Sequence, residues 1–358
     1  MIDEPVILVI NPGSTSTKVA VYRGSREMHA RNIEHSAPEL ARFNLVSEQF
    51  DLRREAIGKW LDTLSEKDRR FAAVAGRGAP LKPLEGGTYA ISAQMLDDVR
   101  TSRYSNHASN LGALLADHFA SHYGVPAYIT DPITVDNFTE LARLSGVPGI
   151  VRRCRSHCLN IKAMGRAEAA RRGKRLNEVN FVIVHMGGGI SVAAVEKGRI
   201  VDVNDGLLGM GPFSPDRAGA LPIGALVELC YSGKYAKQEL IDILSKKSGL
   251  IGYLGEGDLR RVEQMIEAGD KQAELVFRAM AYQVAKEIGA AGAVLKGKIE
   301  AIILTGGMAH SRRLTDEISS YVAFIAPIVM AAGEHEMQAL AEGATRALSG
   351  EEEVKTYS

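Results

Sequence analysis

Short apolar runs that lead into polar loops recur along this chain. Val6–Ile10 is a β-branched apolar run, and a polar loop at residues 11–18 connects it to a second apolar run at Val19–Tyr22. Apolar runs of this length between turn-forming residues are typical of buried strands. The pattern therefore predicts a β-hairpin whose tip is rich in glycine, serine and threonine.

The same hairpin pattern returns in the second half of the chain, at Phe181–Val184 and Val192–Val195. The two hairpins align without gaps at an offset of 174 residues, and the apolar strand at residues 127–131 falls at that offset on residues 301–305. Agreement of two features on one offset indicates an internal duplication. Chance agreement is the alternative, because any two α/β segments share strand–loop patterns.

Segments with helical spacing of apolar residues lie between these strands, which indicates an α/β fold with helix-covered sheets. A chain of 358 residues is too long for one simple core, so we expect two lobes, at residues 1–155 and 156–336. A helix at residues 337–349 is expected to rejoin the first lobe, and the tail from Glu351 to fray. The predicted helices are Asn110–Ser121, Leu159–Arg172, Leu221–Tyr231 and Ala273–Lys296.

Composition narrows the class of protein. The 43 lysines and arginines balance the 43 aspartates and glutamates, and no long basic run occurs, which argues against a nucleic-acid partner. The N-terminus is acidic where a signal peptide needs positive charge, and no apolar run approaches the length of a membrane span. Three sparse cysteines fit a reducing compartment. We therefore expect a cytoplasmic protein with no membrane partner.

Both hairpin tips, and a later glycine loop at residues 304–311, could bind phosphate. Glycine lets the backbone approach an anion, and hydroxyl and N–H groups donate to its oxygens. Tight hairpins also need glycine, so a structural turn explains each loop alone equally well. No P-loop, dinucleotide-binding or protein-kinase motif is present. The candidate phosphate-binding residues are Ser14, Ser16, Lys18, Gly187, Gly188, Gly189, Gly306 and Gly307.

A series of motifs in family order resembles the acetokinase family over residues 5–349. The first motif, Asn11-Pro-Gly-Ser-Thr-Ser-Thr-Lys18, is similar to the form that butyrate kinases carry. The resemblance implies the duplicated α/β fold of actin and hexokinase, of the ribonuclease H-like type, with two similar lobes and an interlobe cleft. The other motifs are Gly76–Leu84, Ser105–Asn110, Thr130–Pro132, His185–Ser191, Gly211–Gly219 and Thr305–Met308.

The resemblance also implies an activity. Butyrate kinases convert butyrate and ATP to butyryl phosphate and ADP, reversibly and with Mg²⁺, and such enzymes form homo-oligomers. The N-terminal lobe would bind the small carboxylic acid and the C-terminal lobe the nucleotide. A kinase for acetate, propionate or a branched-chain acid is the alternative on the same scaffold. A non-catalytic actin-like filament protein or a sugar-sensing ATP-binding repressor would belong to another class.

Four residues match catalytic positions of the family. Arg77 and Arg217 match the two arginines that hold the acid and the transferring phosphoryl group. Asp131 matches an active-site aspartate, and His157 matches a histidine that steadies the transition state. Arginine suits this chemistry because its planar guanidinium binds carboxylate or phosphate through two hydrogen bonds.

Three further residues match positions at the phosphates and the metal. Asn11 corresponds to a residue at the phosphate and the metal ion, and His185 to one at the second hairpin. Glu336 best matches a metal-linked glutamate, with Glu334 as the alternative. The chain departs from acetate kinases at Gly219–Pro222, where those enzymes carry acidic residues.

Overall fold

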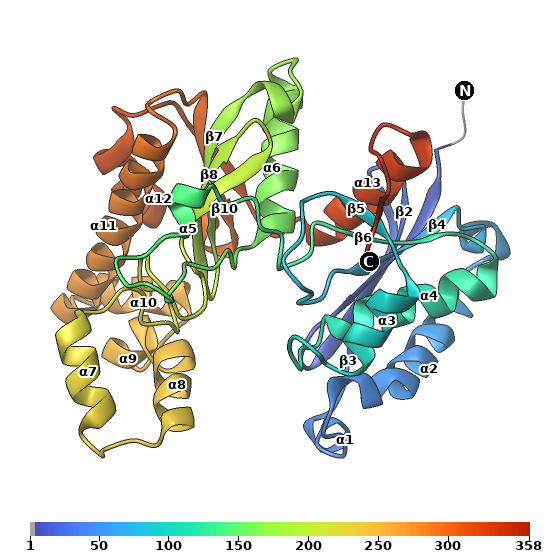
Figure 1. The fold of residues 1–358 in the computed structure, drawn as a ribbon, viewed down its shortest axis with the longest axis horizontal. Helices are drawn as coiled ribbons and strands as arrows, with labels where there is room; N and C mark the ends of the chain where they lie inside the picture. The colour runs from blue at the N-terminus through green and yellow to red at the C-terminus, as the bar shows by residue number, and fades with distance from the viewer. Residues whose placement is uncertain (1–3) are drawn as a thin grey trace. The chain divides into compact units, whose positions relative to one another are not determined.

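The computed structural model describes residues 4–358, and the chain folds into two compact units. The first unit contains the chain up to Val135 together with His335–Ser358, and the second contains Asp136–Glu334. Each unit is a mixed β-sheet with helices packed on it (Figure 1), so the predicted α/β fold is confirmed. Within residues 4–358, no helix is both long and apolar enough to cross a membrane.

The division between the units falls earlier than residue 155, because the segment after Asp136 is bound to the second unit. The Thr139 N–H donates to the Val201 carbonyl at 3.3 Å. Arg152 forms a two-pronged ion pair with Asp202, with N···O distances of 2.6 and 3.1 Å. These contacts attach the connecting segment to a strand of the second sheet.

The first unit is built on a seven-stranded sheet. Its strands, in order across the sheet, are β12 (Lys355–Thr356), β5 (Thr88–Ala90), β6 (Ala127–Thr130), β4 (Ala73–Arg77), β1 (Val6–Pro12), β2 (Ser16–Arg23) and β3 (Arg26–Glu34). β1, β2 and β3 pair antiparallel, whereas β4 is parallel to β1 and β6 is parallel to β4. Ile7, Leu8, Val9 and Ile10 are all fully buried. A strand covered on both faces needs such a continuous apolar run.

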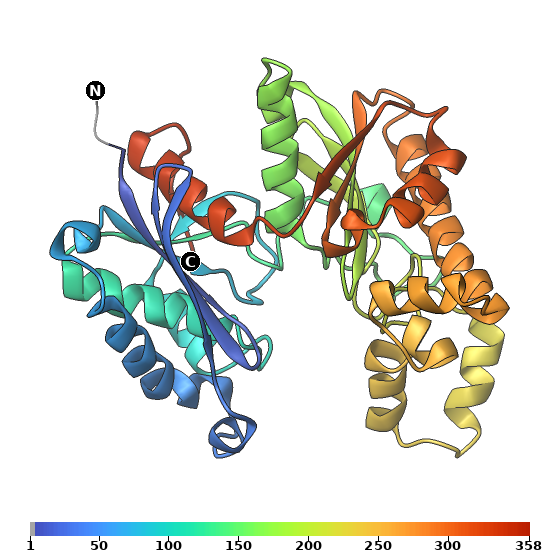
Figure 2. The same cartoon turned by 180° about the vertical axis from the view of Figure 1, so that it is seen from behind.

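Helices cover both faces of this sheet. The helices of the first unit are α1 (Ala37–Leu40), α2 (Phe50–Leu61), α3 (Ala93–Arg100), α4 (Asn110–Tyr123) and α13 (Glu336–Ser349), with short 3₁₀ turns η1 (Val46–Gln49) and η2 (Glu66–Arg69). α4 and α13 both contact β1, β4 and β6, and they do so from opposite faces of the sheet (Figure 2). The C-terminal helix thus packs on the sheet that the N-terminus begins.

The prediction that the tail frays is wrong. The last residues add the edge strand β12, which pairs parallel with β5. Tyr357 is 3% exposed, and its hydroxyl donates to the Asp98 carboxylate at 2.8 Å. Arg346 binds Glu352 at 2.8 Å and ties the tail back to α13. One buried aromatic ring therefore orders a segment whose composition is polar.

The second unit is built on a five-stranded sheet, with α6 and α11 on opposite sides of it (Figure 1). The strands, in order across the sheet, are β11 (Ile328–Ala332), β10 (Ala301–Gly306), β7 (Asn180–Met186), β8 (Ile190–Glu196) and β9 (Arg199–Val203). The helices are α5 (Glu140–Arg143), α6 (Cys158–Arg171), α7 (Ile223–Tyr231), α8 (Lys237–Lys246), α9 (Gly249–Leu254), α10 (Leu259–Glu267), α11 (Lys271–Val294) and α12 (Arg312–Val322), with 3₁₀ turns η3 (Leu176–Glu178) and η4 (Gly307–His310). The four helices expected from sequence are confirmed as α4, α6, α7 and α11.

The two sheets repeat one topology. β3-β2-β1-β4-β6 in the first sheet corresponds to β9-β8-β7-β10-β11 in the second, and both β1–β2 and β7–β8 are antiparallel hairpins. The hairpins therefore correspond as predicted, but the second matched pair is wrong. β10 lies beside β7 as β4 lies beside β1, so β10 corresponds to β4 and not to β6. Every parallel strand of such a fold is apolar and ends in a polar loop, so a gapless alignment cannot distinguish neighbours.

Candidate active site

The tip of the first hairpin is a tight turn with exposed hydroxyl groups. The Gly13 N–H donates to the Ser16 carbonyl at 2.7 Å, which closes the turn. Ser14 and Lys18 are exposed, and Ser16 is half-buried. Asn11 and Lys18 are directly opposite each other in the β1–β2 pair, so their side chains project from the same face. The tip therefore presents a hydroxyl, an amide and an ammonium group together.

Arg77, Glu336 and Asn11 meet in the first unit. Arg77 ends β4, Asn11 lies near the end of the neighbouring β1, and Glu336 begins α13. Arg77 Nη1 lies 2.7 Å from Glu336 Oε1, and Asn11 Nδ2 donates to Glu336 Oε2 at 3.1 Å. The structure thus brings together three of the predicted site residues, and Arg77 already binds a carboxylate. The alternative glutamate, Glu334, is exposed.

Two glycines set the position of Arg77. A Cβ built on Gly112, in the first turn of α4, would overlap the backbone carbonyl of Arg77. A Cβ on Gly76 would overlap the Gly112 carbonyl. Burial, followed by the charge of Arg77, lowers the pKa of the nearby His107 imidazole. The His107 Nδ1 accepts the Ser109 N–H at 3.2 Å, so this histidine also caps the turn that leads into α4.

Asp131 follows β6 and is 2% exposed, with a φ of 42°. A residue other than glycine rarely adopts this left-handed conformation. The carboxylate accepts the Gly87 N–H at 2.8 Å, and the Asp131 N–H donates to the Gly87 carbonyl at 3.0 Å. Thr130, the residue before it, pairs with Arg77 across β6 and β4. Asp131 therefore holds the segment beside Arg77 through a backbone contact.

His157 and His185 stack on each other in the second unit. Their ring centroids are 3.9 Å apart and the planes differ by 14°. The His157 Nδ1 lies 2.9 Å from the Ser191 hydroxyl, and the His185 Nδ1 lies 3.0 Å from Asn160 Oδ1. The stack joins the start of α6 to the second hairpin, which contains His185 and Ser191.

Asn160 and Ser191 were missed by the sequence analysis, although they fix the two imidazole rings. Both side chains are fully buried, which is unusual for polar residues and requires hydrogen-bond partners. The available signal was Asn160 itself, a polar residue between apolar neighbours and three positions after His157, the N-cap residue of the same helix. Residues three apart in a helix lie on one face.

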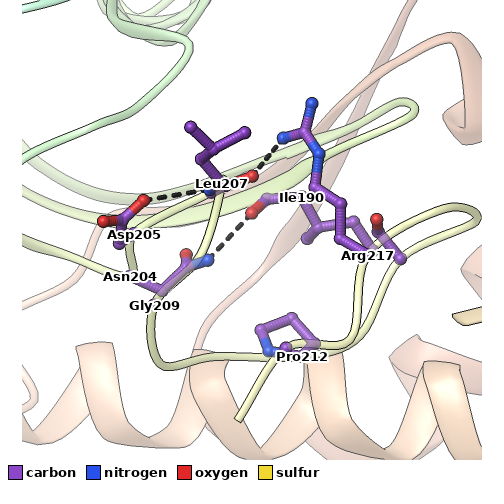
Figure 3. Close-up of a pocket in the computed structure, with 10 residues that line it drawn as sticks. Ile190, Asn204, Asp205, Leu207, Gly209, Pro212 and Arg217 are labelled. Carbon is purple, nitrogen blue, oxygen red and sulfur yellow. Dashed lines mark hydrogen bonds between the residues drawn. The ribbon is translucent and has the colours of Figure 1, made fainter. Parts of the chain in front are cut away.

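Arg217 reaches back over the second hairpin tip (Figure 3). Its guanidinium donates to the Gly206 carbonyl, and a Cβ at Gly189 would overlap it, so the glycine makes room for the arginine. The Ser214 hydroxyl donates to the Gly188 carbonyl, which ties the Arg217 loop to the same tip. A small pocket beside them is lined by Ile190, Asn204, Asp205, Gly206, Leu207, Gly209, Pro212, Ser214, Arg217 and Gly219.

The other glycines predicted to bind phosphate in the second unit are Gly187, Gly306 and Gly307. A Cβ at Gly187 would come 3.3 Å from the His185 Nε2. Gly306 has a φ of 89°, and a Cβ there would overlap the Met186 backbone, so glycine is required where β10 ends beside β7. A Cβ on Gly307 would meet no atom within 4 Å. The start of η4 is therefore open enough for a ligand to approach the backbone.

The residues predicted near the metal fit Mg²⁺. Asn11 and Glu336 supply amide and carboxylate oxygens, the ligand type that Mg²⁺ prefers. Within residues 4–358, no group of three or more His, Cys, Asp or Glu residues could form a complete metal cage. Mg²⁺ in phosphoryl-transfer sites needs no such cage, because phosphate oxygens and water complete its coordination.

Comparison with known proteins agrees with this architecture. Acetate kinase from Porphyromonas gingivalis has a TM-score of 0.77 and 17% identity, with 95% of this chain and 99% of that chain covered. A propionate kinase from Francisella tularensis has a TM-score of 0.74 and 18% identity, with 95% and 98% covered. Acetate kinase from Entamoeba histolytica has a TM-score of 0.74 and 17% identity, with 94% and 98% covered. Because the sequence identities are this low, the likeness concerns the fold alone. It confirms the predicted actin/hexokinase-like α/β fold.

The sequence of the second unit adds a family assignment. Residues 148–324 match the model of the acetokinase family. The matched segment contains the histidine stack, the second hairpin tip, Arg217 and the glycine loop after β10. The sequence of the second unit is therefore that of the acetokinase family.

Proposed function

We propose that this chain is a cytoplasmic butyrate kinase, which transfers a phosphoryl group from ATP to butyrate and returns it from butyryl phosphate to ADP. The match of its second unit to the acetokinase family supports an ATP-dependent kinase of short-chain carboxylates. The observation that carries the narrower assignment to an acid acceptor is Arg77, whose guanidinium binds the Glu336 carboxylate at 2.7 Å. The wording of residues 11–18, which resembles butyrate kinases, favours butyrate.

A carboxylate acceptor explains the chemistry of the first unit. A short fatty acid is ionised at neutral pH, so it attacks phosphorus without a general base. Asp131, whose carboxylate accepts the Gly87 N–H, then orients its segment and takes no proton. The remaining difficulty is repulsion between two anions. Arg77 holds the acid, Arg217 holds the transferring phosphoryl group, and their positive charges offset that repulsion.

His157 contributes a hydrogen-bond donor in this proposal. The Ser191 hydroxyl oxygen accepts the His157 backbone N–H at 3.4 Å and lies 2.9 Å from Nδ1. We assign the hydroxyl proton to the Nδ1 contact, which places the ring proton of the neutral imidazole on Nε2. An Nε2–H can donate to a phosphoryl oxygen and stabilise the charge that develops there.

Asn11 and Glu336 would hold Mg²⁺, which supplies positive charge at the phosphate oxygens when it is bound. Glu336 now binds Arg77 and Asn11 together. Glu336 therefore lies beside Arg77, and in this proposal the metal ligands adjoin the arginine that binds the acid. Nucleotide phosphates would lie at the glycines of the second hairpin and of the loop after β10.

Substrate choice is expected to be graded, with butyrate ahead of propionate and acetate lowest. Each CH₂ buried in an apolar site contributes at most about 0.8 kcal/mol, so two extra carbons favour butyrate over acetate by roughly fifteen-fold in kcat/KM. The measurement is trapping of the acyl phosphate as its hydroxamate, at fixed ATP and Mg²⁺, for straight and branched acids of two to six carbons.

The same assay separates the alternatives. A maximum at acetate or propionate would leave a carboxylate kinase but overturn the assignment to butyrate. If none of the acids gives an acyl phosphate and ATP consumption depends on a sugar instead, the assignment of a carboxylic acid as the acceptor would be overturned. Absence of any acceptor-dependent ATP consumption would favour a non-catalytic ATP-binding protein.

We also propose that the enzyme is a homo-oligomer, with α7 in the contact between copies. Ile223, Val227 and Tyr231 are 77%, 49% and 87% exposed, and their four-residue spacing places them on one face of α7. Such a stripe of apolar side chains in water marks an interaction surface. The fitting occupant is the same stripe on a second copy, because isologous contacts are self-complementary.

The oligomer is expected to dissociate when α7 is made charged. Ile223→Glu combined with Tyr231→Glu should convert the wild-type particle to a monomer, measured as mass by light scattering after gel filtration. Leu275→Glu, at a residue of α11 that is 64% exposed, is the control and should leave the mass unchanged. A monomeric wild type, or an unchanged mass in the double variant, would contradict the proposal.

A further inference from the structure

Arg53 is a fully buried cation beneath the first hairpin tip. It lies in the first turns of α2 and is 0% exposed. Burial lowers the pKa of its guanidinium to about 10, so the group is still charged at neutral pH. Among residues 4–358, no carboxylate forms an ion pair with it. An uncompensated charge in the interior is costly, so its retention requires an explanation.

The Arg53 guanidinium is bonded to the tip itself. Nη1 donates to the carbonyls of Gly13 at 2.9 Å and Ser16 at 2.8 Å, and Nη2 donates to the Ser14 carbonyl at 3.2 Å. On its other side, Gln49 Oε1 accepts from Nε at 3.2 Å and from Nη2 at 2.8 Å. One side chain therefore binds three carbonyls of the turn, with the neutral Gln49 amide on its other side.

This arrangement determines where the N–H groups of the tip point. In a planar trans peptide, the carbonyl of one residue and the N–H of the next point in opposite directions. The residues of the tip have trans peptides, and the Gly13 and Ser14 carbonyls point inward to Arg53. The N–H groups of Ser14 and Thr15 therefore point outward, where both residues are exposed. Successive outward N–H groups form an anion-binding concavity.

A buried hydroxyl continues the same network. Thr17 Oγ1 accepts from Arg53 Nη1 at 3.0 Å and lies 2.9 Å from the His35 Nε2. The Thr15 carbonyl accepts the His35 backbone N–H at 2.8 Å. The carbonyls of residues 13 to 16 thus all accept hydrogen bonds from within the unit. The tip is a preorganised element whose donors need no rearrangement when an anion arrives.

We propose that Arg53 is a positioning residue of the phosphoryl site. It holds the β1–β2 tip with its N–H groups outward, and it places an uncompensated positive charge behind them. The ligand is the phosphoryl group that is transferred, as the terminal phosphate of ATP or the phosphate of an acyl phosphate. This inference rests on the proposed phosphotransfer function and adds the group that makes the first tip attract an anion.

Gln49→Glu tests the charge without removing the hydrogen bonds. A glutamate oxygen can accept the same two Arg53 N–H groups, so the tip keeps its support, but its carboxylate now neutralises the guanidinium. We expect the dissociation constant of Mg²⁺·AMPPNP to rise about tenfold, while that of Mg²⁺·ADP, which lacks the terminal phosphate, stays within about twofold. Both are measured by titration calorimetry with butyrate present. Arg53→Lys should also raise the ratio of the AMPPNP dissociation constant to the ADP dissociation constant, because an ammonium cannot span three carbonyls.

Arg54→Met is the matched control. Arg54 is the next residue of α2, pairs with Asp51 at 3.2 Å and is partly exposed, so its loss removes a cation without touching the tip. Arg54→Met should leave the ratio of the AMPPNP and ADP dissociation constants unchanged. A proportional weakening of both nucleotides in Gln49→Glu, or no weakening of either, would overturn the role of Arg53.

Wild-type turnover separates this inference from the proposed function. A changed AMPPNP-to-ADP ratio in an enzyme that phosphorylates no short-chain acid would keep the phosphoryl site and reject the acid acceptor. Acid-dependent turnover with an unchanged ratio would keep the acid kinase and reject the inference.

Discussion

Arg77→Ala and Arg217→Ala are each expected to lower kcat by about two orders of magnitude or more while the protein stays folded. In the proposed mechanism, each change removes a cation from a place where negative charge accumulates during transfer. Arg77 lies 2.7 Å from the Glu336 carboxylate, and Arg217 packs over Gly189 of the second tip. The measurement is hydroxamate formation from butyrate at saturating ATP, with thermal unfolding recorded for each variant.

Lysine variants and a distant arginine serve as controls. Arg77→Lys and Arg217→Lys should restore only part of the lost turnover, because an ammonium retains the charge but not the planar two-pronged geometry. Arg278→Ala removes a surface ion pair with Glu317 and should leave kcat within about twofold of wild type. Near-normal turnover in both alanine variants would remove the proposed mechanism.

Gly112→Ala is expected to damage both stability and turnover through one methyl group. The added Cβ would overlap the Arg77 carbonyl, so α4 or the end of β4 must shift. Such overpacking typically costs about 1–3 kcal/mol of unfolding free energy. The shift also moves Arg77, the proposed acid-binding residue, and a displacement of about 1 Å at a reacting centre can lower turnover by about 100-fold. Chemical denaturation and the hydroxamate assay measure the two effects separately.

The same substitution at an open helical position provides the comparison. Gly289 lies in α11, and a Cβ there would meet no atom within 4 Å. Gly289→Ala should therefore raise the unfolding free energy by about 0.5–1 kcal/mol, because alanine loses less backbone entropy in a helix. Wild-type stability and turnover in Gly112→Ala would show that the approach of α4 to β4 does not position Arg77.

Local patterns were sufficient to predict the secondary structure around the candidate site. The apolar runs at Val6–Ile10 and Phe181–Val184 became β1 and β7, because buried strands and tight turns each have a short-range signature. The same holds for the long helix α11, which the predicted segment Ala273–Lys296 matches to within two residues at either end. The polar loop residues were likewise visible, since glycine and hydroxyl side chains define a hairpin tip by themselves.

Local patterns could not predict which distant elements of the chain pair with each other. β10 could be matched to β6 in sequence, but pairing in the sheet shows that it corresponds to β4. The contact of Arg77 with Glu336 joins residues far apart in the chain, and the ordered tail depends on the contact of Tyr357 with Asp98. Such contacts depend on how helices and strands pack, which residue spacing does not encode.

Arg53 illustrates both sides of this division. Its sequence position was informative, because Arg53, Ile57 and Leu61 share one face of α2 and all three are buried. However, Arg53 and Arg54 stand side by side in a charged stretch, where exposure to water is the ordinary expectation for either. Sequence alone therefore determined the two hairpins, the main helices and the chemistry of the loops. Only the tertiary structure decided which arginine lies beneath the hairpin tip, because the carbonyls that satisfy a buried guanidinium come from a different part of the chain.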